Sequence, residues 1–269
     1  MATTIGMLDS GVGGLTILRA IREQLPGQPV VYLADQAHVP YGVRSLDEVR
    51  RFTKEITQFL IDQGAKLIVV ACNTASVAAL SYLRNEYPET PFVGMEPAVK
   101  PAAEQTKTGV VGVLATYATF QTEVYNSVKE RFAKNVTVIQ NHCPGLVNQI
   151  EKGDLTGFET RKILESALRP MVAQGIDTVV LGCTHYPFVI PLIEEIVGPK
   201  VRVIDPAPAI ARQTQRLLME HGWLSDGIIG SEIRLITTGN AQTIEKNLPL
   251  YLGYHLPVES IQWVDEKLG

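Results

Sequence analysis

Two cysteines stand in matched places in the two halves of this chain. Cys72 follows the apolar run 67–70, Cys183 follows the apolar run 178–181, and a helix-like stretch comes after each. Such runs predict buried strands of a parallel sheet. We therefore expect each thiol at the carboxyl end of a strand and just before a helix. Open α/β sheets bind ligands at that place, and a helix dipole there favours a thiolate.

Two activated thiols on opposite sides of one substrate can take a proton from one face and return one to the other, which is the chemistry of a racemase. A free thiol has a pKa of about 8.5, so each needs help near neutrality. His185 lies two residues beyond Cys183 and could relay or stabilise charge. Asp9 ends the first predicted strand and would lie beside Cys72 if the two strands are neighbours. Asp9 or Ser10 could also cap the following helix.

The pairing of the cysteines carries this interpretation, because a single buried cysteine is more often an inert small hydrophobic residue than a nucleophile. The third cysteine, Cys143, lies in the loop 141–145 and has no partner in the first half, so we assign it a structural role. Three cysteines at wide spacing do not make a disulfide framework, which favours a reduced, cytosolic protein.

The matching extends to the elements that must position the cysteines. Predicted strands occupy 5–8, 30–33, 67–70 and 92–95 in the first half and 110–114, 136–139, 178–181 and 201–204 in the second. Helical patterns between most of them predict parallel sheets with right-handed crossovers. The repeat is too long for a solenoid. We therefore expect an α/β protein of two pseudo-symmetric parallel-sheet domains, with the active site in the cleft between them.

Proline and glycine residues mark the expected crossings between the domains, near 96–108 and near 205–208. Residues 1–97 and 207–269 are expected to form the first domain, and residues 98–206 the second. The chain after the second crossing has no counterpart in the repeat and is expected to return to the first domain. Its predicted elements are a helix at 209–220, a strand at 233–236, a helix at 241–251 and a strand at 258–263.

Local signals place the helices of the first half. A helix is predicted over 15–25, ended by a Pro-Gly pair. Ser45 and Glu48 predict a capping box at the start of the next helix, and Gly64 fits the position after its end. The predicted buried stripe of that helix is Val49, Phe52, Ile56 and Leu60.

A nucleotide site would use the glycine-rich turn after the first strand. Gly11-x-Gly13 after a strand, with Asp35 ending the next strand, imitates a dinucleotide fingerprint. Thr16 stands where the third glycine is needed, and the acidic Asp9 would face a pyrophosphate. The glycines are better suited to a close backbone approach to a small carboxylate at the helix N-terminus.

Metal binding and hydrolysis would each use the cysteine and the histidine of the second half. Cys183 and His185 could be zinc ligands, but His142 and Cys143 form the only further cluster of such residues, and the spacing is poor. A Cys-His hydrolase would use Cys183 as nucleophile and His185 as base. That interpretation leaves Cys72 and the duplication unexplained.

The bulk properties restrict the partners and the location. The chain has 269 residues, enough for one large or two modest domains. A net charge of −4 without a basic stripe gives no support to a nucleic-acid partner. Apolar runs are shorter than a membrane span, and the N-terminus lacks the basic and apolar regions of a signal peptide. We expect a cytoplasmic protein with no membrane partner.

Four motifs together closely resemble those of the bacterial glutamate racemases, over the whole chain and in order: Asp9–Gly14, Pro40–Gly42, Ala71–Ala75 and Gly182–Pro187. The two cysteine motifs as a pair are highly specific. The resemblance implies a racemase without cofactors, neither pyridoxal phosphate nor metal, that converts L-glutamate to D-glutamate for peptidoglycan synthesis. It also favours a homodimer.

The resemblance implies roles for single residues. Cys183 would deprotonate L-glutamate and Cys72 would deprotonate D-glutamate, with Asp9 and His185 as assisting groups. Glu151 matches a further acid near the cleft, and a solvated carboxylate at a helix end fits that residue equally well. Positions that match substrate-holding residues are Asp9, Ser10, Tyr41, Gly42, Asn73, Thr74, Thr184 and His185. Hydroxyls are added by Thr116 and Thr119, the second-half counterparts of the turn after the first strand.

His185 and the Tyr-Pro pair after it favour glutamate over aspartate as the substrate. A related aspartate racemase is the alternative within this class of enzyme. A Cys-His hydrolase and a non-catalytic binding protein are the alternatives outside it.

Overall fold

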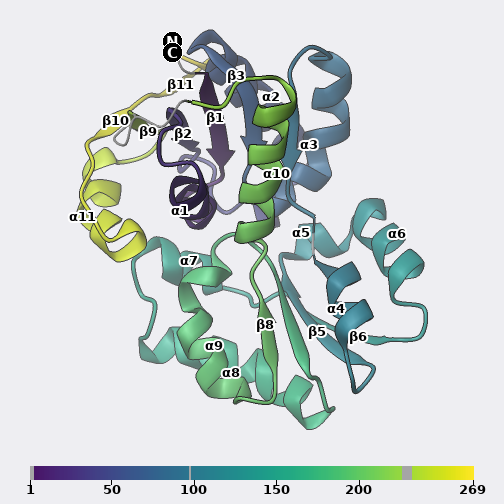
Figure 1. The fold of residues 1–269 in the computed structure, drawn as a ribbon. Helices are drawn as coiled ribbons and strands as arrows, with labels where there is room; N and C mark the ends of the chain where they lie inside the picture. Colours follow the sequence, from purple (N-terminus) through teal and green to yellow (C-terminus); the bar gives the residue numbers. More distant parts are fainter. Residues whose placement is uncertain (1–2, 97, 226–231) are drawn as a thin grey trace. The chain divides into compact units, whose positions relative to one another are not determined.

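The structure is a computed structural model that describes residues 3–96, 98–225 and 232–269 (Figure 1). Pro97, the expected last residue of the first domain segment, lies outside the described residues. The chain forms two compact units, Met1–Met95 with Ala207–Gly269 and Glu96–Pro206. Each unit is built on its own parallel sheet, which confirms the predicted α/β class with two parallel-sheet domains.

The first unit contains a six-stranded sheet in the order β10-β9-β2-β1-β3-β4, with all its neighbouring strands parallel. Its strands are β1 (Thr4–Asp9), β2 (Val30–Ala34), β3 (Ala65–Val70), β4 (Phe92–Gly94), β9 (Ile233–Thr237) and β10 (Val258–Ser260). The strands β1, β2 and β3 are buried along almost their whole length, as expected of apolar runs covered by helices on both faces.

Helices of the first unit pack in two groups. α1 (Leu15–Gln24) packs against α10 (Ala207–Glu220) and α11 (Ala241–Leu252), while α2 (Leu46–Asp62) packs against α3 (Asn73–Glu86). The short 3₁₀ helix η1 (Tyr41–Val43) lies between β2 and α2 in the chain. Elements from residues after 206 thus complete both the sheet and one helical layer.

The second unit contains a four-stranded parallel sheet in the order β6-β5-β7-β8. Its strands are β5 (Val110–Ala115), β6 (Thr137–Asn141), β7 (Thr178–Gly182) and β8 (Arg202–Ile204). Its helices are α4 (Val99–Gln105), α5 (Tyr117–Phe120), α6 (Glu123–Phe132), α7 (Leu146–Glu151), α8 (Phe158–Ala173), η2 (Tyr186–Val189) and α9 (Ile190–Val197). α4 packs against α6, and α8 packs against α7 and α9.

The register of the two sheets supports the predicted duplication. The order β2-β1-β3-β4 in the first sheet equals β6-β5-β7-β8 in the second. Leu8 of β1 pairs with Val70 of β3, and Leu114 of β5 pairs with Leu181 of β7. Cys72 stands two residues after Val70, and Cys183 stands two residues after Leu181. The two thiols therefore occupy equivalent positions in the two sheets.

The predicted capping box at the start of α2 is confirmed. Ser45 Oγ accepts the backbone N–H of Glu48, and the Glu48 carboxylate accepts the backbone N–H of Ser45 at 3.1 Å. Gly64 follows the helix with a φ of 88°, the left-handed conformation that glycine adopts at this position without strain. The four residues of the predicted stripe are all buried.

The predicted single strand over 258–263 is wrong, because the chain leaves the large sheet after Ser260. β11 (Trp263–Val264) and β12 (Lys267–Leu268) form a separate antiparallel hairpin. The turn between them uses Asp265 and Glu266 with φ of 46° and 66°. Aspartate is common in such turns, but glutamate stands here where a glycine usually follows, so the pair is a weaker turn signal than Asn-Gly or Asp-Gly.

Among the helices in the described part of the chain, none is both long enough and apolar enough to cross a membrane.

Candidate active site

Cys72 is positioned by the junction of β3 and α3. It is the N-cap residue of α3, and its buried Sγ accepts the backbone N–H of Ala75 at 3.4 Å. An amide at a helix N-terminus stabilises negative charge, so this junction favours the thiolate form. The predicted placement of Cys72 between a strand and a helix is confirmed.

Asp9 stands at the end of the neighbouring strand. β1 and β3 are adjacent as expected, and the backbone N–H of Ala71 donates to Leu8 O at 2.8 Å. The Asp9 carboxylate is fully buried, and its Oδ2 accepts the backbone N–H of Gly11 at 2.9 Å. A buried carboxylate therefore lies on the strand beside the one that carries the thiol.

The predicted helix cap by Asp9 or Ser10 is wrong. α1 begins at Leu15 after Gly14, which makes no side-chain cap bond. The chain turns for several residues before the helix, so the Asp9 carboxylate stabilises this turn and does not cap the helix. Gly14 is needed for close packing, because a Cβ there would come within 2.7 Å of Tyr32 Oη and 2.8 Å of Asp9 Cβ.

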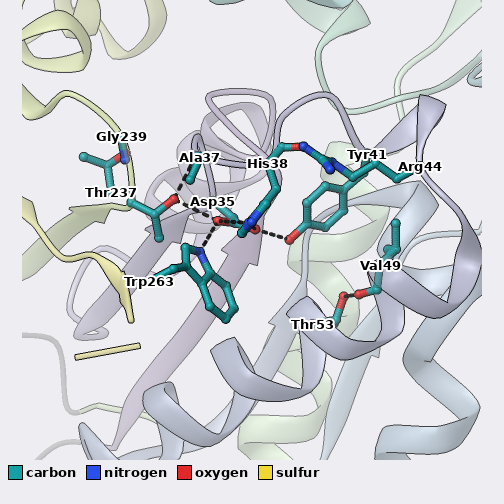
Figure 2. A network of polar contacts seen from close by, with 11 residues as sticks. Asp35, Ala37, His38, Tyr41, Arg44, Val49, Thr53, Thr237, Gly239 and Trp263 are labelled. Carbon is teal, nitrogen blue, oxygen red and sulfur yellow. Dashed lines mark hydrogen bonds and ion pairs between the residues drawn. The ribbon is translucent and has the colours of Figure 1, made fainter. Parts of the chain in front are cut away.

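Tyr41 and Gly42 are buried in η1. The Tyr41 hydroxyl donates to Asp35 Oδ2 at 2.7 Å, and Figure 2 shows the ring directed at that carboxylate. Burial raises the pKa of Tyr41 well above its usual value, and the charges of Asp35, Cys72 and Asp9 raise it further. These acidic groups therefore lie close enough to influence the phenol, which stays protonated.

The first turn of α3 carries the amide and the hydroxyl that follow Cys72. Asn73 and Thr74 are both buried. In the described structure, neither the Asn73 Nδ2 nor its Oδ1 has a hydrogen-bond partner. Leaving a buried polar group unpaired costs about 1–3 kcal/mol, so Asn73 is suited to a ligand that supplies both a donor and an acceptor.

Cys183 is likewise buried after β7, but the element that follows it differs from the prediction. The chain passes through Thr184 and His185 into η2, and the α-helix α9 starts only at Ile190. The expected α-helix N-terminus directly after this thiol is wrong. Pro187 lacks an N–H and disfavours the α conformation of the residue before it, which suits a 3₁₀ turn here.

His185 connects Cys183 to Glu151. Its Nδ1 lies 3.8 Å from Cys183 Sγ, and its Nε2 lies 2.6 Å from Glu151 Oε1. Burial alone would lower the pKa of His185, but the bonds to Cys183 and Glu151 outweigh it and raise that pKa well above 6.5. The imidazole is therefore charged near neutrality and can stabilise a thiolate at Cys183.

Glu151 is not a solvated carboxylate at a helix end, so that expectation is wrong. It is the last residue of α7, its side chain is 11% exposed, and it is paired with a His185 side chain that is 2% exposed. The second unit thus adds a carboxylate to the thiol and the imidazole that the sequence pattern had already paired.

Comparison with known proteins agrees with this chemistry. The sequence profile of the Asp/Glu/hydantoin racemases matches residues 6–214. A glutamate racemase of Pseudomonas aeruginosa is 47% identical over 252 residues, which cover 94% of this chain and 95% of the relative. The chain belongs to the Asp/Glu/hydantoin racemase family. A racemase is an isomerase, so the chain is an enzyme of that class.

Solved structures of the racemase family share the two-domain fold. Glutamate racemase from Bacillus anthracis matches with a TM-score of 0.85 and 34% identity, covering 97% of both chains. Escherichia coli glutamate racemase, solved in complex with L-glutamate, matches with a TM-score of 0.85 and 32% identity. That match covers 97% of this chain and 98% of the other.

In this member of the racemase family, the two predicted threonines of the second unit contact each other. Thr116 caps α5 by accepting the backbone N–H of Thr119, and their hydroxyl oxygens are 2.9 Å apart. Both are buried, as are Ser10 and Thr184.

Cys143 is a buried thiol with a φ of 43°. Burial, together with the nearby Cys183, raises its pKa to about 12, so it stays neutral, as a structural role requires. In the described residues, no group of three or more His, Cys, Asp or Glu side chains is arranged to hold a metal ion.

Asp35 is the residue whose surroundings sequence reasoning missed. In the sequence, Asp35 is notable only as the acidic residue of an incomplete dinucleotide-binding fingerprint. In the structure, its carboxylate accepts hydrogen bonds from other residues of the protein. Tyr41 bonds to one oxygen, and Thr238 and Trp263 each bond to the other at 2.8 Å. Its separation from Thr238 and Trp263 in sequence hid the network.

Proposed function

We propose that this chain interconverts L-glutamate and D-glutamate by a two-base mechanism in which Cys72 and Cys183 act on opposite faces of the α-carbon. The observation that carries the proposal is that the two thiols occupy equivalent positions in the two sheets. Each thiol has charged neighbours of a different kind. Support for glutamate comes from the curated relatives named glutamate racemase and from the L-glutamate in the E. coli structure.

In the forward direction, the Cys183 thiolate takes the α-proton of L-glutamate, and the Cys72 thiol returns a proton to the opposite face. His185, held charged by Glu151, stabilises the Cys183 thiolate before this step. In the reverse direction, Cys72 is the base, and Asp9 on the adjacent strand accepts or holds the proton of its thiol.

The α-proton of an amino acid is far less acidic than a thiol, so the site must stabilise a carbanion by electrostatics. Preorganised donors around the α-carboxylate in a site closed to water are the means available to these residues. The buried Asn73 amide, for which the described residues provide no partner, is suited to this task. The proposed substrate-holding residues are Asp9, Ser10, Tyr41, Gly42, Asn73, Thr74, Thr116, Thr119, Thr184 and His185.

Exclusion of water from the site would strengthen the electrostatic interactions that stabilise the carbanion. We further propose that the enzyme works in the cytoplasm as a homodimer, needs no cofactor, and supplies D-glutamate for peptidoglycan. These statements follow from the resemblance to the glutamate racemases.

Racemisation in deuterated water tests the proposal. The purified protein, treated with chelator and without pyridoxal phosphate, is incubated with L-glutamate, D-glutamate or L-aspartate and followed by circular dichroism and proton NMR. We expect deuterium at Cα of glutamate, loss of optical activity, and no other change in composition. Preferential turnover of aspartate, hydrolysis of a substrate bond, or activity that requires added metal would contradict it.

A further inference from the structure

Asp35 is a fully buried carboxylate with donors on both oxygens (Figure 2). Oδ2 accepts the Tyr41 hydroxyl at 2.7 Å and lies 2.9 Å from His38 Nδ1. Oδ1 accepts the Thr238 hydroxyl and the Trp263 indole N–H, each at 2.8 Å. Such a set of donors compensates a buried negative charge for its lost hydration.

Two of these four donors come from the part of the chain that follows the second unit. Thr238 comes directly after β9, which pairs with β2, and its backbone N–H donates to Ala34 O at 3.1 Å. Trp263 opens the hairpin of β11 and β12. Residues without a counterpart in the duplicated part of the fold thus bond the loop that leads to Tyr41 and Gly42.

Trp263 also packs on the rings beside this loop. His38 stacks on Phe52 of α2 with centroids 3.8 Å apart, and the Trp263 ring meets these two rings edge-on at 5.1 and 5.6 Å. Arg44 Nε donates to His38 O at 2.5 Å. The loop is therefore held between α2 and the hairpin.

We propose that Asp35 and Trp263 are positioning residues for the Tyr41–Gly42 turn. Trp263 holds the Asp35 carboxylate in place by its indole N–H, and Asp35 fixes the Tyr41 phenol through a bond to the other oxygen. This inference rests on the proposed function, in which Tyr41 and Gly42 hold glutamate. Without the indole donor, the buried carboxylate of Asp35 loses one of its four partners, and its geometry toward Tyr41 relaxes.

A double-mutant cycle between Trp263→Phe and Tyr41→Phe tests the inference, with kcat and KM for L-glutamate measured in each variant. Trp263→Phe keeps a smaller ring against His38 and Phe52 and removes the indole donor. We expect it to lower kcat/KM about tenfold, mostly through KM, in the otherwise unchanged enzyme. In the Tyr41→Phe background, we expect no further loss, because the bond through which Trp263 acts is already absent.

Equal losses in both backgrounds would mean that Trp263 is merely structural and would overturn the inference, as would unchanged kinetics of the Trp263→Phe variant. If that variant does not fold, Asp35→Asn takes its place in the same cycle with the same expectations. Trp223→Phe is the matched control, because the ring of this other tryptophan lies tilted against that of His221, with centroids 4.4 Å apart, and makes no bond to Asp35. Absence of glutamate racemisation in the unchanged enzyme would refute the proposed function as well.

Discussion

The two halves of the molecule place their cysteines identically and surround them differently. Both thiols follow the central strand pair of their sheet by the same number of residues. Cys72 has a helix N-terminal amide and the carboxylate of Asp9 on the adjacent strand, whereas Cys183 has the charged pair of His185 and Glu151. The duplicated fold therefore determines where each sulfur lies, whereas the charged groups beside each sulfur differ between the halves.

A second pair of equivalent positions shows the same divergence. Leu8 pairs with Leu33, and Leu114 pairs with Asn141, so Asp35 and Cys143 stand two residues past equivalent partners. Asp35 is a buried carboxylate with four donors, while Cys143 is a thiol whose pKa is raised to about 12 by burial and by Cys183. The first half therefore has a carboxylate at this position, whereas the second half has a neutral thiol at the equivalent position.

Removal of either thiol is expected to have the largest effect. Cys72→Ser and Cys183→Ser should each lower racemisation by about 10²–10⁴-fold, because one turnover needs an acid and a base on opposite faces. The measurement is kcat/KM in both directions, with circular dichroism to show that the variants are folded. If either folded variant keeps near-normal activity, the functional equivalence of the two halves is wrong.

His185→Asn should have the second-largest effect. We expect it to lower the rate of racemisation about 10²-fold and to impair deprotonation of L-glutamate more than that of D-glutamate. The variant removes the charged imidazole next to Cys183 and leaves the Cys72 side unchanged. The Haldane relation fixes the ratio of kcat/KM in the two directions, so steady-state rates cannot show the asymmetry. Deuterium wash-in and the primary isotope effect, measured separately for each enantiomer, can show it.

Asp9→Asn is the mirror experiment for the first unit. It removes the buried carboxylate on the strand beside Cys72, so we expect deprotonation of D-glutamate to suffer more, with a loss comparable to or smaller than that of His185→Asn. The same isotope measurements apply. Equal changes in the two directions for both variants would show that the helpers are not assigned to separate thiols.

Glu151→Gln should change how stability depends on pH. The folded-state pKa of His185 is raised, so the stability that its charge contributes is fully present below the unfolded value of about 6.5. That contribution is lost as the pH rises through the folded pKa. Removing Glu151 takes away one cause of the raised pKa, so Tm should fall less between neutral and alkaline pH than in the unchanged protein. Thermal unfolding across this range, followed by circular dichroism, measures it, and identical slopes would contradict the pairing.

Cys143→Ala should have the smallest effect on catalysis. Its thiol is held neutral by burial, so we expect kcat/KM to stay within about twofold while the loss of buried volume lowers stability slightly. Kinetics and Tm of the variant are compared with those of the unchanged enzyme. A large loss of racemisation without loss of stability would mean that Cys143, like the equivalent Asp35, has a chemical role.

The parts that could be predicted from the sequence are those set by local pattern. Apolar runs placed Cys72 and Cys183 at strand ends, and Ser45 with Glu48 predicted a helix start that the structure confirms. The 3₁₀ turn after Cys183 was missed because a proline within a helical pattern predicts an interruption without saying which turn replaces the helix.

The contacts that tune the site could not be predicted, because they join residues far apart in the chain. His185 meets Glu151 from 34 residues away, and Trp263 meets Asp35 from 228 residues away. Such pairs depend on which loops the topology brings together, and periodicity within a window of residues carries no information about them. The hairpin that presents Trp263 was missed for a local reason, since Glu266 stands where a glycine usually marks such a turn.

The discontinuity of the first unit has a consequence for the order in which the protein folds during synthesis. Glu96–Pro206 is one uninterrupted segment and can fold as soon as it leaves the ribosome. The first unit must wait, because β9, β10 and the Trp263 hairpin are made after the second unit. Until they arrive, β2 remains an unpaired edge and the carboxylate of Asp35 lacks half its donors. The nascent chain therefore carries an exposed strand edge, a hazard for association with other chains, until β9 has been made.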